Sequence, residues 1–163
     1  MQFNIRDARF SDEGVILDIF NYFTENSYAA YTENPERSAF FKRLWQVSEG
    51  YPFYVAENSA GEIIGFALLH AYYQLPVFRR AARITYFIKT EYTRQGLGTM
   101  FLDKLIRDAR ELGIDNILAS ISSLNDQSLQ FHLKHGFAEC GRFLKAGRKW
   151  GRDFDEVWMQ KLL

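Results

Sequence analysis

The segment Thr93–Leu102 combines residue types that can bind an anion. Gly96 and Gly98 stand one residue apart, between a predicted strand over 83–88 and a predicted amphipathic helix that begins at Gly98. Glycine permits a tight turn and a close approach of ligand because it has no Cβ. The first turn of a helix also presents unpaired backbone N–H groups and a partial positive charge. The segment therefore predicts a phosphate site, with an ordinary glycine-containing turn as the alternative.

The glycine spacing differs from two common nucleotide-binding fingerprints. A dinucleotide fingerprint requires a third glycine three residues after Gly98, where this chain has Phe101. A P-loop requires Gly-Lys-Ser/Thr, which does not follow here. The predicted ligand is therefore a phosphate group held in another type of strand-to-helix loop.

A second polar segment follows the next predicted strand. Asn125 and Ser128 stand at the start of a predicted helix over 126–135, and His132 lies one turn further on. Asn125 and Ser128 could contact a polar cofactor. Plain N-capping is the alternative, and both can hold at once. His132 has a catalytic interpretation and a packing interpretation, and the residue types alone do not separate them.

Together the two segments resemble the GCN5-related N-acetyltransferase (GNAT) family. The coenzyme A loop of that family is Q/R-x-x-G-x-G/A. Here the glycines match, Thr93 stands at the Q/R position, and Arg94 comes one residue later. The family's second motif is N-x-x-A/S, then Tyr four residues later, then Gly-Phe. Its spacing is met throughout by Asn125, Ser128, His132, Gly136 and Phe137.

The similarity extends over nearly the whole chain to the phosphinothricin and methionine sulfoximine acetyltransferase branch. That branch also has His at the position of His132. This chain differs from the branch in its middle, where Arg83 replaces a carboxylate and residues 79–82 replace an Arg-x-Ala-Tyr segment. It differs again at Asp153, where the branch has Trp. The resemblance is therefore stronger for the residues expected to bind the cofactor than for those expected to bind the acceptor.

The resemblance implies that acetyl-CoA is the co-substrate and that no metal takes part. It also implies a mixed α/β fold with a central, mostly antiparallel sheet and helices on both faces. The residues expected to bind the cofactor are Phe87, Ile88, Arg94, Gln95, Gly96, Leu97, Gly98, Thr99, Asn125 and Ser128.

The implied reaction is direct attack of an amine on the thioester, with a backbone N–H near Phe87 and Ile88 polarising the carbonyl. Cys140 is then not needed as a nucleophile. His132 is the expected catalytic residue, because an imidazolium with a pKa near 6.5 can protonate a thiolate whose conjugate acid has a pKa near 8.5. With Arg83 in place of a carboxylate, we expect an amine of low pKa, or a base such as Glu33 or Glu91 acting through water.

The expected acceptor is a small-molecule amine, most simply an amino acid or an amino-acid analogue. Arg79 and Arg83, with Arg80 between them, could bind a substrate carboxylate in a bidentate manner, and a solvated basic loop is the alternative. Tyr31 is also expected to contact the acceptor. Two other functions stay open: a module that binds acetyl-CoA without turnover, and a peptide or protein N-acetyltransferase.

Composition narrows the class of protein. The 163 residues suit one domain over 1–163. Twenty basic and twenty acidic side chains cancel, which argues against nucleic acid or a membrane as a partner. A single cysteine and the lack of a long apolar run favour the cytoplasm. The terminal strands and the aromatic content allow a homodimer.

Hydrophobic periodicity predicts the remaining elements. A helix is expected after Ser11 as N-cap and another from Asn34-Pro35 to Gly50, and Gly113 is expected to end the helix that follows the loop. The predicted strands cover Phe3 to Ala8, 52–57, 62–70, 83–88, 116–121, 137–145 and 153–162.

Overall fold

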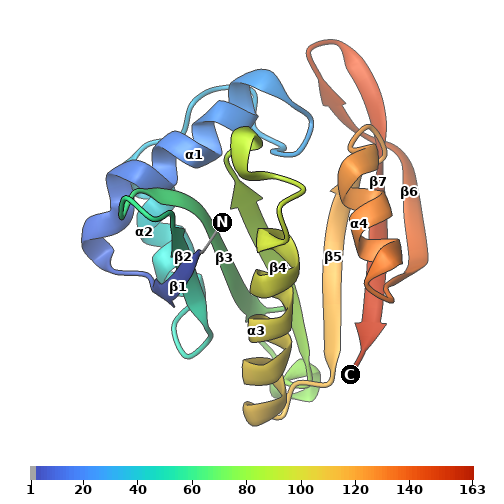
Figure 1. Ribbon diagram of the computed structural model, residues 1–163. Helices are drawn as coiled ribbons and strands as arrows, with labels where there is room; N and C mark the ends of the chain where they lie inside the picture. The colour runs from blue at the N-terminus through green and yellow to red at the C-terminus, as the bar shows by residue number, and fades with distance from the viewer. Residues whose placement is uncertain (1–2) are drawn as a thin grey trace.

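A seven-stranded mixed sheet organises residues 3–163, the part of the chain that the computed structural model describes (Figure 1). Its strands lie in the order β1-β2-β3-β4-β5-β7-β6. Within the described residues, β4 and β5 pair in parallel and every other neighbouring pair is antiparallel. The strands are β1 Asn4–Asp7, β2 Phe53–Glu57, β3 Ile63–Ala71, β4 Ala81–Ile88, β5 Asn116–Ser122, β6 Ala138–Lys149 and β7 Arg152–Leu162. The predicted mostly antiparallel sheet is confirmed.

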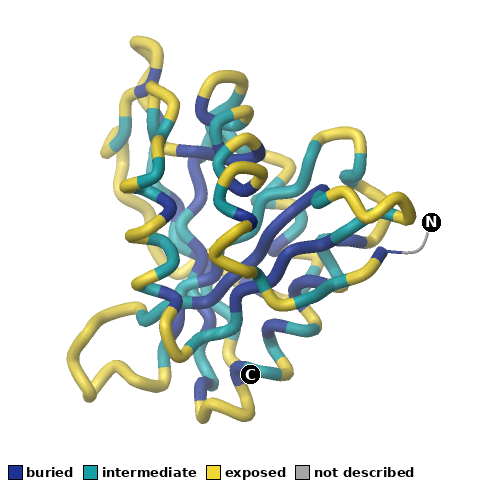
Figure 2. The backbone as a smooth tube through the Cα atoms, turned by 90° about the vertical axis from the view of Figure 1, so that its left-hand side faces the viewer, coloured by how far each residue is buried: buried dark blue, intermediate teal, exposed yellow. Residues whose placement is uncertain are grey.

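Helices cover both faces of this sheet, as predicted. They are α1 Glu13–Asn26, α2 Ser38–Val47, α3 Leu97–Glu111 and α4 Asp126–Lys134. Successive side chains of a strand point to opposite faces, so each central strand supplies two cores. In β3, Phe66 and Leu68 pack with α1 and α2, whereas Ala67 and Leu69 pack with α3. The buried stretches near the centre of Figure 2 are dark blue.

Strands β4 and β5 stay paired over a short distance only. The ladder joins Ala81–Arg83 to Asn116–Leu118, although β4 continues to Ile88 and β5 to Ser122. Beyond Arg83 the two strands diverge (Figure 1). Because β3 continues to pair with β4 up to Ile88, the edge of β4 that faces β5 is left open.

A long hairpin of β6 and β7 reaches back to the segment after α1. Its two-residue turn has Trp150 and Gly151 at φ values of 51° and 75°, as a type I′ turn requires. Next to the turn, the buried Lys149 donates from Nζ to the carbonyl oxygens of Ser27 at 2.6 Å and Ala30 at 2.9 Å. The hairpin therefore holds the segment that carries Tyr31.

Two predicted helix starts are wrong. Residues Phe10–Asp12 form a 3₁₀ turn and α1 begins at Glu13, so Ser11 is not its N-cap. The second helix begins at Ser38 rather than at Asn34-Pro35. Asn21 on α1 explains the delay, because its side chain accepts from the backbone N–H of Glu36 at 2.7 Å and donates to the Glu36 carbonyl at 2.9 Å. These bonds hold the chain before α2 in a non-helical form.

The other differences concern boundaries. The helix after the loop begins at Leu97, one residue before the predicted start, and β4 begins at Ala81. The last hairpin is longer than predicted, since β6 runs to Lys149 and β7 begins at Arg152. Gly113 follows the end of α3 with a φ of 75°, as predicted for a C-terminal glycine. No helix of residues 3–163 has the length and hydrophobicity needed to span a bilayer.

Candidate functional site

The divergence of β4 and β5 opens a cleft of about 930 Å³. Its walls are the outer half of β4, the end of β5, α4, the segment after α1 and the loop before α3. This volume falls in the range of small-molecule sites, roughly 300–1,000 Å³. Among the residues predicted from the sequence, the cleft brings together Tyr31, Arg83, Phe87, Ile88, Arg94, Gly96, Gly98, Thr99, Asn125, Ser128 and His132.

The loop before α3 has the backbone conformation of an anion site. Arg94 and Gly96 adopt left-handed conformations with φ values of 60° and 89°, and Gly96 is the N-cap of α3. The first intrahelical bond runs from Met100 N to Gly96 O at 3.0 Å. The N–H groups of the first helical turn, which includes Gly98 and Thr99, therefore precede the helical hydrogen-bond ladder at one end of the cleft. They can donate to a phosphate.

Helices α3 and α4 meet closely beside this loop. A Cβ on Gly98 would lie 3.2 Å from the ring of Phe131 on α4, so glycine permits the contact. The hydroxyl of Thr99 bonds Nε2 of His135 at 3.0 Å, and Nδ1 of His135 bonds the Phe131 carbonyl at 2.8 Å. Since a carbonyl only accepts, Nδ1 of His135 is the donor to Phe131. Thr99 therefore joins the two helices.

The open edge of β4 presents backbone groups to the cleft. Lys89 N donates to Ile64 O of β3 at 2.8 Å, and bonding groups alternate in direction along a strand. The N–H of Phe87 consequently points towards β3, where Phe87 pairs with Phe66. The N–H groups of Tyr86 and Ile88 point the other way, into the space between β4 and β5. Of the two expected backbone donors, only that of Ile88 faces the cleft.

Asn125 has the predicted capping geometry at the start of α4. Its Oδ1 accepts from Ser128 N at 3.3 Å. The hydroxyl of Ser128 lies 3.3 Å from Nδ1 of His132. N-capping is thus the observed contact of Asn125, and both side chains also line the cleft.

His132 is buried on α4 and is fixed at both ring nitrogens. Nδ1 lies 2.7 Å from the carbonyl oxygen of Ser128, so Nδ1 is the protonated nitrogen. Nε2 is therefore an acceptor, and it receives a hydrogen bond from the hydroxyl of Tyr86. Burial lowers the pKa of His132 to about 4, and the nearby His135 adds to this effect. The expectation of an imidazolium with a pKa near 6.5 is wrong, and His132 is neutral at pH 7.

Tyr86 crosses from β4 to α4 and closes one wall of the cleft. Its ring stacks on the His132 ring with centroids 5.5 Å apart and an interplanar angle of 16°. Burial raises the pKa of the Tyr86 hydroxyl well above its usual value, so the hydroxyl stays protonated at neutral pH. The bond to His132 Nε2 takes the one proton of Tyr86 and fixes its hydroxyl beside the open edge of β4.

The opposite end of the cleft carries both an arginine and a carboxylate network. The guanidinium of Arg83 lies over the ring of Trp158 at 5.0 Å, and no carboxylate of residues 3–163 is within ion-pairing distance of it. The hydroxyl of Tyr31 lies 2.9 Å from Ser120 Oγ, which donates to Glu156 Oε1 at 2.5 Å. This end can therefore bind a carboxylate and an amine at the same time.

Several residues predicted for the site lie elsewhere. Arg79 is exposed outside the cleft, and its neighbour Arg80 pairs with Asp115. Leu97 is buried in the core, and the side chain of Gln95 donates to the Glu91 carbonyl at 2.8 Å. The remaining candidates outside the lining of the cleft are Glu33, Glu91 and the exposed Cys140.

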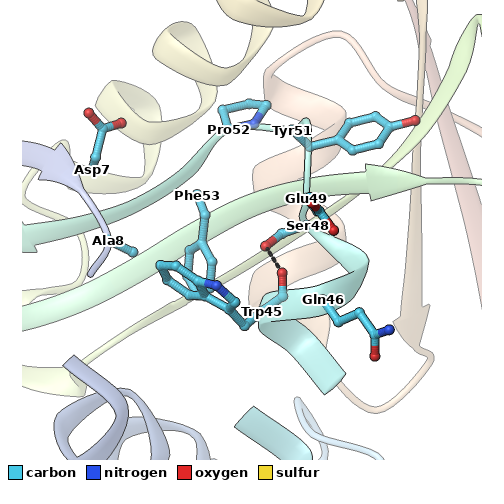
Figure 3. A pocket seen from close by; sticks show the side chains of 9 residues that line it. All are labelled: Asp7, Ala8, Trp45, Gln46, Ser48, Glu49, Tyr51, Pro52 and Phe53. Carbon is cyan, nitrogen blue, oxygen red and sulfur yellow. Dashed lines mark hydrogen bonds between the residues drawn. The ribbon is translucent and has the colours of Figure 1, made fainter. Parts of the chain in front are cut away.

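A smaller hollow of about 500 Å³ lies where α2 ends and β2 begins (Figure 3). Trp45, Tyr51 and Phe53 form its apolar part, and Ser48 Oγ donates to the Trp45 carbonyl at 2.8 Å. Its lining includes none of the residues predicted for the site. Within residues 3–163, no group of three or more His, Cys, Asp or Glu side chains is arranged to hold a metal ion.

Sequence reasoning missed Tyr86, Ser120 and Glu156. The alternation of the predicted strands places Tyr86 and Arg83 on opposite faces, but it does not indicate that β4 leaves β5 and frees Tyr86 to reach α4. Ser120 and Glu156 lie on neighbouring strands, in a register that only the sheet topology reveals. A single sequence carries no signal for either contact.

Comparison with known proteins supports the resemblance. The model of the acetyltransferase (GNAT) family matches residues 16–137. An L-methionine sulfoximine/L-methionine sulfone acetyltransferase of Pseudomonas paraeruginosa is 33% identical over 98% of this chain and 94% of its own length.

Two solved structures share the fold. A phosphinothricin acetyltransferase of Sinorhizobium meliloti in complex with acetyl-CoA has a TM-score of 0.93 at 28% identity, covering 100% of this chain and 89% of that one. A ribosomal-protein-alanine N-acetyltransferase of Brucella melitensis has a TM-score of 0.90 at 30% identity, covering 98% and 99%. The seven-stranded sheet with its helices is therefore that of an acetyltransferase.

The burial of His132 predicts a loss of stability in acid. Its pKa is near 6.5 in the unfolded chain and about 4 in the fold, so the unfolded state binds more protons between these values. The stabilisation is complete above pH 6.5 and falls by about 2–3 kcal/mol as the pH drops to about 4.5. Urea unfolding at both pH values should show a smaller loss in His132→Gln than in the wild type. Equal losses would contradict the assignment of a neutral, buried histidine.

Proposed function

The chain belongs to the GNAT family of acetyltransferases, and on that premise we propose that the acceptor of the acetyl group is the α-amine of an amino acid or amino-acid analogue. The enzyme is an acetyl-CoA-dependent N-acetyltransferase. The observation that carries the proposal is the single cleft with an anion-binding helix start at one end and the free guanidinium of Arg83 at the other. One end suits a diphosphate and the other suits an amino-acid carboxylate.

The loop before α3 is the proposed seat of the diphosphate. The N–H groups of Gly98 and Thr99 lie at the first turn of α3, and the positive end of the helix dipole favours an anion there. Arg94, Gly96, Asn125 and Ser128 line the same end of the cleft and complete the proposed cofactor contacts. Gln95 and Leu97 contribute backbone only, because their side chains are directed elsewhere.

The open edge of β4 is the proposed place of the thioester. The amine attacks the carbonyl carbon, and the carbonyl oxygen takes up the displaced electron pair. The N–H of Ile88 faces this space and stabilises that oxygen, in the manner of an oxyanion hole. The carbonyl then re-forms as the C–S bond breaks and sulfur leaves as a thiolate. Most of the rate enhancement comes from holding the amine and the thioester together, which can lower the activation barrier by roughly 7–11 kcal/mol.

Tyr86 and His132 are proposed to act together on the leaving sulfur. The neutral His132 cannot donate from Nε2, but as an acceptor it fixes the hydroxyl of Tyr86 beside the cleft. Full transfer of the Tyr86 proton to a thiolate would be uphill, because an ordinary phenol has a pKa of about 10 and a thiol about 8.5. His132 Nε2 holds the one proton of Tyr86 in the resting site, and Tyr86 stabilises the thiolate by turning this O–H bond from Nε2 to sulfur as the charge develops.

The acceptor half favours an amino acid on electrostatic grounds. Arg83 lines the cleft beside the ring of Trp158, and a guanidinium can hold a carboxylate through two parallel hydrogen bonds. At pH 7, deprotonation of an α-amine with a pKa near 8 costs about 1 kcal/mol, whereas deprotonation of a lysine-like amine costs about 4–5 kcal/mol. The related methionine sulfoximine acetyltransferase of Pseudomonas paraeruginosa supports the same class of acceptor.

One other acceptor is favoured by a specific observation. A structural neighbour is a ribosomal-protein-alanine N-acetyltransferase, which favours a peptide N-terminus as the acceptor. Free amino acids outcompeting alanyl peptides would support the proposed acceptor, and release of thiol would exclude a module that binds acetyl-CoA without turnover.

The proposal also covers the domain organisation, oligomeric state and cellular location of the enzyme. The continuous seven-stranded sheet supports one catalytic domain over 1–163. Exposed Phe143 and Leu144 on the edge strand β6 support a homodimer. The single free cysteine supports a cytoplasmic location, and the reaction as written uses no metal.

A glycine comparison tests the cofactor site and the function together. Gly96 and Gly113 flank the two ends of α3 with φ values of 89° and 75°, and both have open space where a Cβ would stand. Alanine strains both positions alike, but only Gly96 lies in the cleft. By isothermal titration, Gly96→Ala should weaken acetyl-CoA binding at least about tenfold, whereas Gly113→Ala should stay within about twofold. Equal effects would place the cofactor elsewhere, and binding without thiol release over an amine panel would favour the non-catalytic module.

Substitution of Tyr86 and His132 tests the pair. Each of Tyr86→Phe and His132→Ala should lower kcat at least about tenfold with little change in the KM for acetyl-CoA, because the lost interaction forms as charge develops on sulfur. The double variant should be no slower than the slower single variant, since the two residues act as a unit. Additive losses in steady-state assays would show that the two residues act independently. An unchanged kcat in the single variants would exclude a catalytic role for the pair.

The role of Arg83 is tested by the charge of the acceptor. The wild type should prefer an amino acid over its carboxamide by at least about tenfold in kcat/KM, and Arg83→Met should abolish this preference. Arg79→Met is the matched control, because Arg79 lies outside the cleft and its loss should leave the preference intact. A wild type that prefers cationic polyamines would exclude the carboxylate contact.

A further inference from the structure

Three side chains at the acceptor end of the cleft form a continuous hydrogen-bonded chain that ends on a carboxylate. Tyr31 OH lies 2.9 Å from Ser120 Oγ, and Ser120 Oγ lies 2.5 Å from Glu156 Oε1. The second distance is that of a charge-assisted bond between a hydroxyl and an ionised carboxylate. Tyr31 and Ser120 line the cleft, and Glu156 stands behind them on β7.

The chemistry of the three groups fixes the direction of the chain. An ionised carboxylate only accepts, so the single proton of Ser120 points to Glu156. Ser120 Oγ is then the acceptor in its bond with Tyr31, and Tyr31 is the donor. With its proton committed to Ser120, the Tyr31 oxygen keeps lone pairs for a donor in the cleft. An ammonium group is such a donor.

We propose that Tyr31, Ser120 and Glu156 carry the proton away from the acceptor amine during acetyl transfer, a role that rests on the proposed function. Before attack, an N–H bond of the acceptor ammonium breaks and its proton passes to the Tyr31 oxygen, which frees the nitrogen lone pair to form the bond to the carbonyl carbon. The second proton, which this nitrogen loses as the carbonyl re-forms, passes to the departing thiolate. The Tyr31 proton passes to Ser120, and the Ser120 proton passes to Glu156. Glu156 ends neutral and returns its proton to solvent after the product leaves.

The surroundings hold this chain in place and limit the other charges that face it. The ring of Phe154 stacks on Tyr31 with centroids 5.5 Å apart, in space that a Cβ on Gly147 would fill. The bonds from Lys149 to Ser27 and Ala30 fix the segment before Tyr31.

Charged groups also lie near this chain in the described structure: Lys149 beside the segment of Tyr31, and Arg83 on β4. From β4, Arg83 faces Tyr31 and cannot accept a proton. From β5 and β6, the register partners of Glu156 are Ser122 and Phe143, which carry no charge.

Other acids are less suited to this role. Glu33 accepts a hydrogen bond from Trp150 N at 2.6 Å, and within the described residues no side-chain hydrogen bond joins Glu33 or Glu91 to a residue that lines the cleft. Asp126 lines the cleft at the start of α4, where it shares the end that carries the loop before α3. Glu156 is the carboxylate that the hydrogen bonds connect to the acceptor end.

The pH dependence of Glu156→Gln tests the proposal. The amide oxygen of glutamine can still accept from Ser120, so the geometry persists while the final proton acceptor is lost. At pH 7, kcat/KM for the amino-acid acceptor should fall at least about tenfold. The deficit should shrink to less than about threefold near pH 9.5, where an α-amine of pKa about 8 is already free. Tyr31→Phe breaks the first link and should show the same convergence.

Matched controls separate this role from a structural one. Glu139→Gln is the same substitution at an exposed position of β6 and should follow the wild-type pH profile. Acetyl-CoA binding by titration should be unchanged in all variants, which shows that they fold. A deficit in Glu156→Gln that is constant across pH, or one confined to the acceptor KM, would overturn the proton path. A wild type that releases no thiol with any amine would instead overturn the proposed function, and the proton path with it.

Discussion

The early end of the β4–β5 ladder is the constraint on which the site depends. Three residues of β4 pair with β5, and the outer half of β4 then has β3 as its one strand partner within the described chain. Backbone groups that face such a gap need a partner, because an unpaired buried N–H costs about 1–3 kcal/mol. The divergence therefore creates a cleft and, at the same time, lines it with oriented donors. A ligand that supplies carbonyl groups along this edge replaces the missing strand.

The two walls of the cleft are held in place by separate sets of contacts. On the proposed cofactor side, Gly98 allows Phe131 to pack closely, and Thr99 bonds His135, so α3 and α4 are fixed relative to each other. On the proposed acceptor side, Lys149 at the tip of the last hairpin binds the carbonyls of the segment that carries Tyr31. These contacts join segments that are far apart in the chain. The positions of the residues that line the cleft are therefore set by the whole sheet and not by the loops alone.

Much of the fold and half of the site follow from the sequence because they are local. The glycines before α3, the cap at Asn125 and the end of α3 at Gly113 each depend on the backbone preference of one residue, and the structure confirms these positions. The start of α2 depends on Asn21, which binds the chain before α2, and the length of the last hairpin depends on Phe154, which packs against Gly147. Because these partners are distant in the sequence, hydrophobic periodicity predicts the wrong boundaries for both elements. The burial that lowers the pKa of His132 has the same tertiary origin.

Charge is distributed along the cleft in a way that suits a zwitterionic acceptor. Arg83 on β4 and Glu156 on β7 both act on Tyr31, with opposite sign, and neither forms an ion pair with the other in the described chain. If they were paired directly, each would neutralise the other and neither could serve a ligand. In the described structure Ser120 donates a hydrogen bond to Glu156, and the guanidinium of Arg83 lies over the Trp158 ring. The proposed amino-acid acceptor offers a carboxylate to Arg83 and an ammonium to the Tyr31 oxygen that Glu156 supports through Ser120.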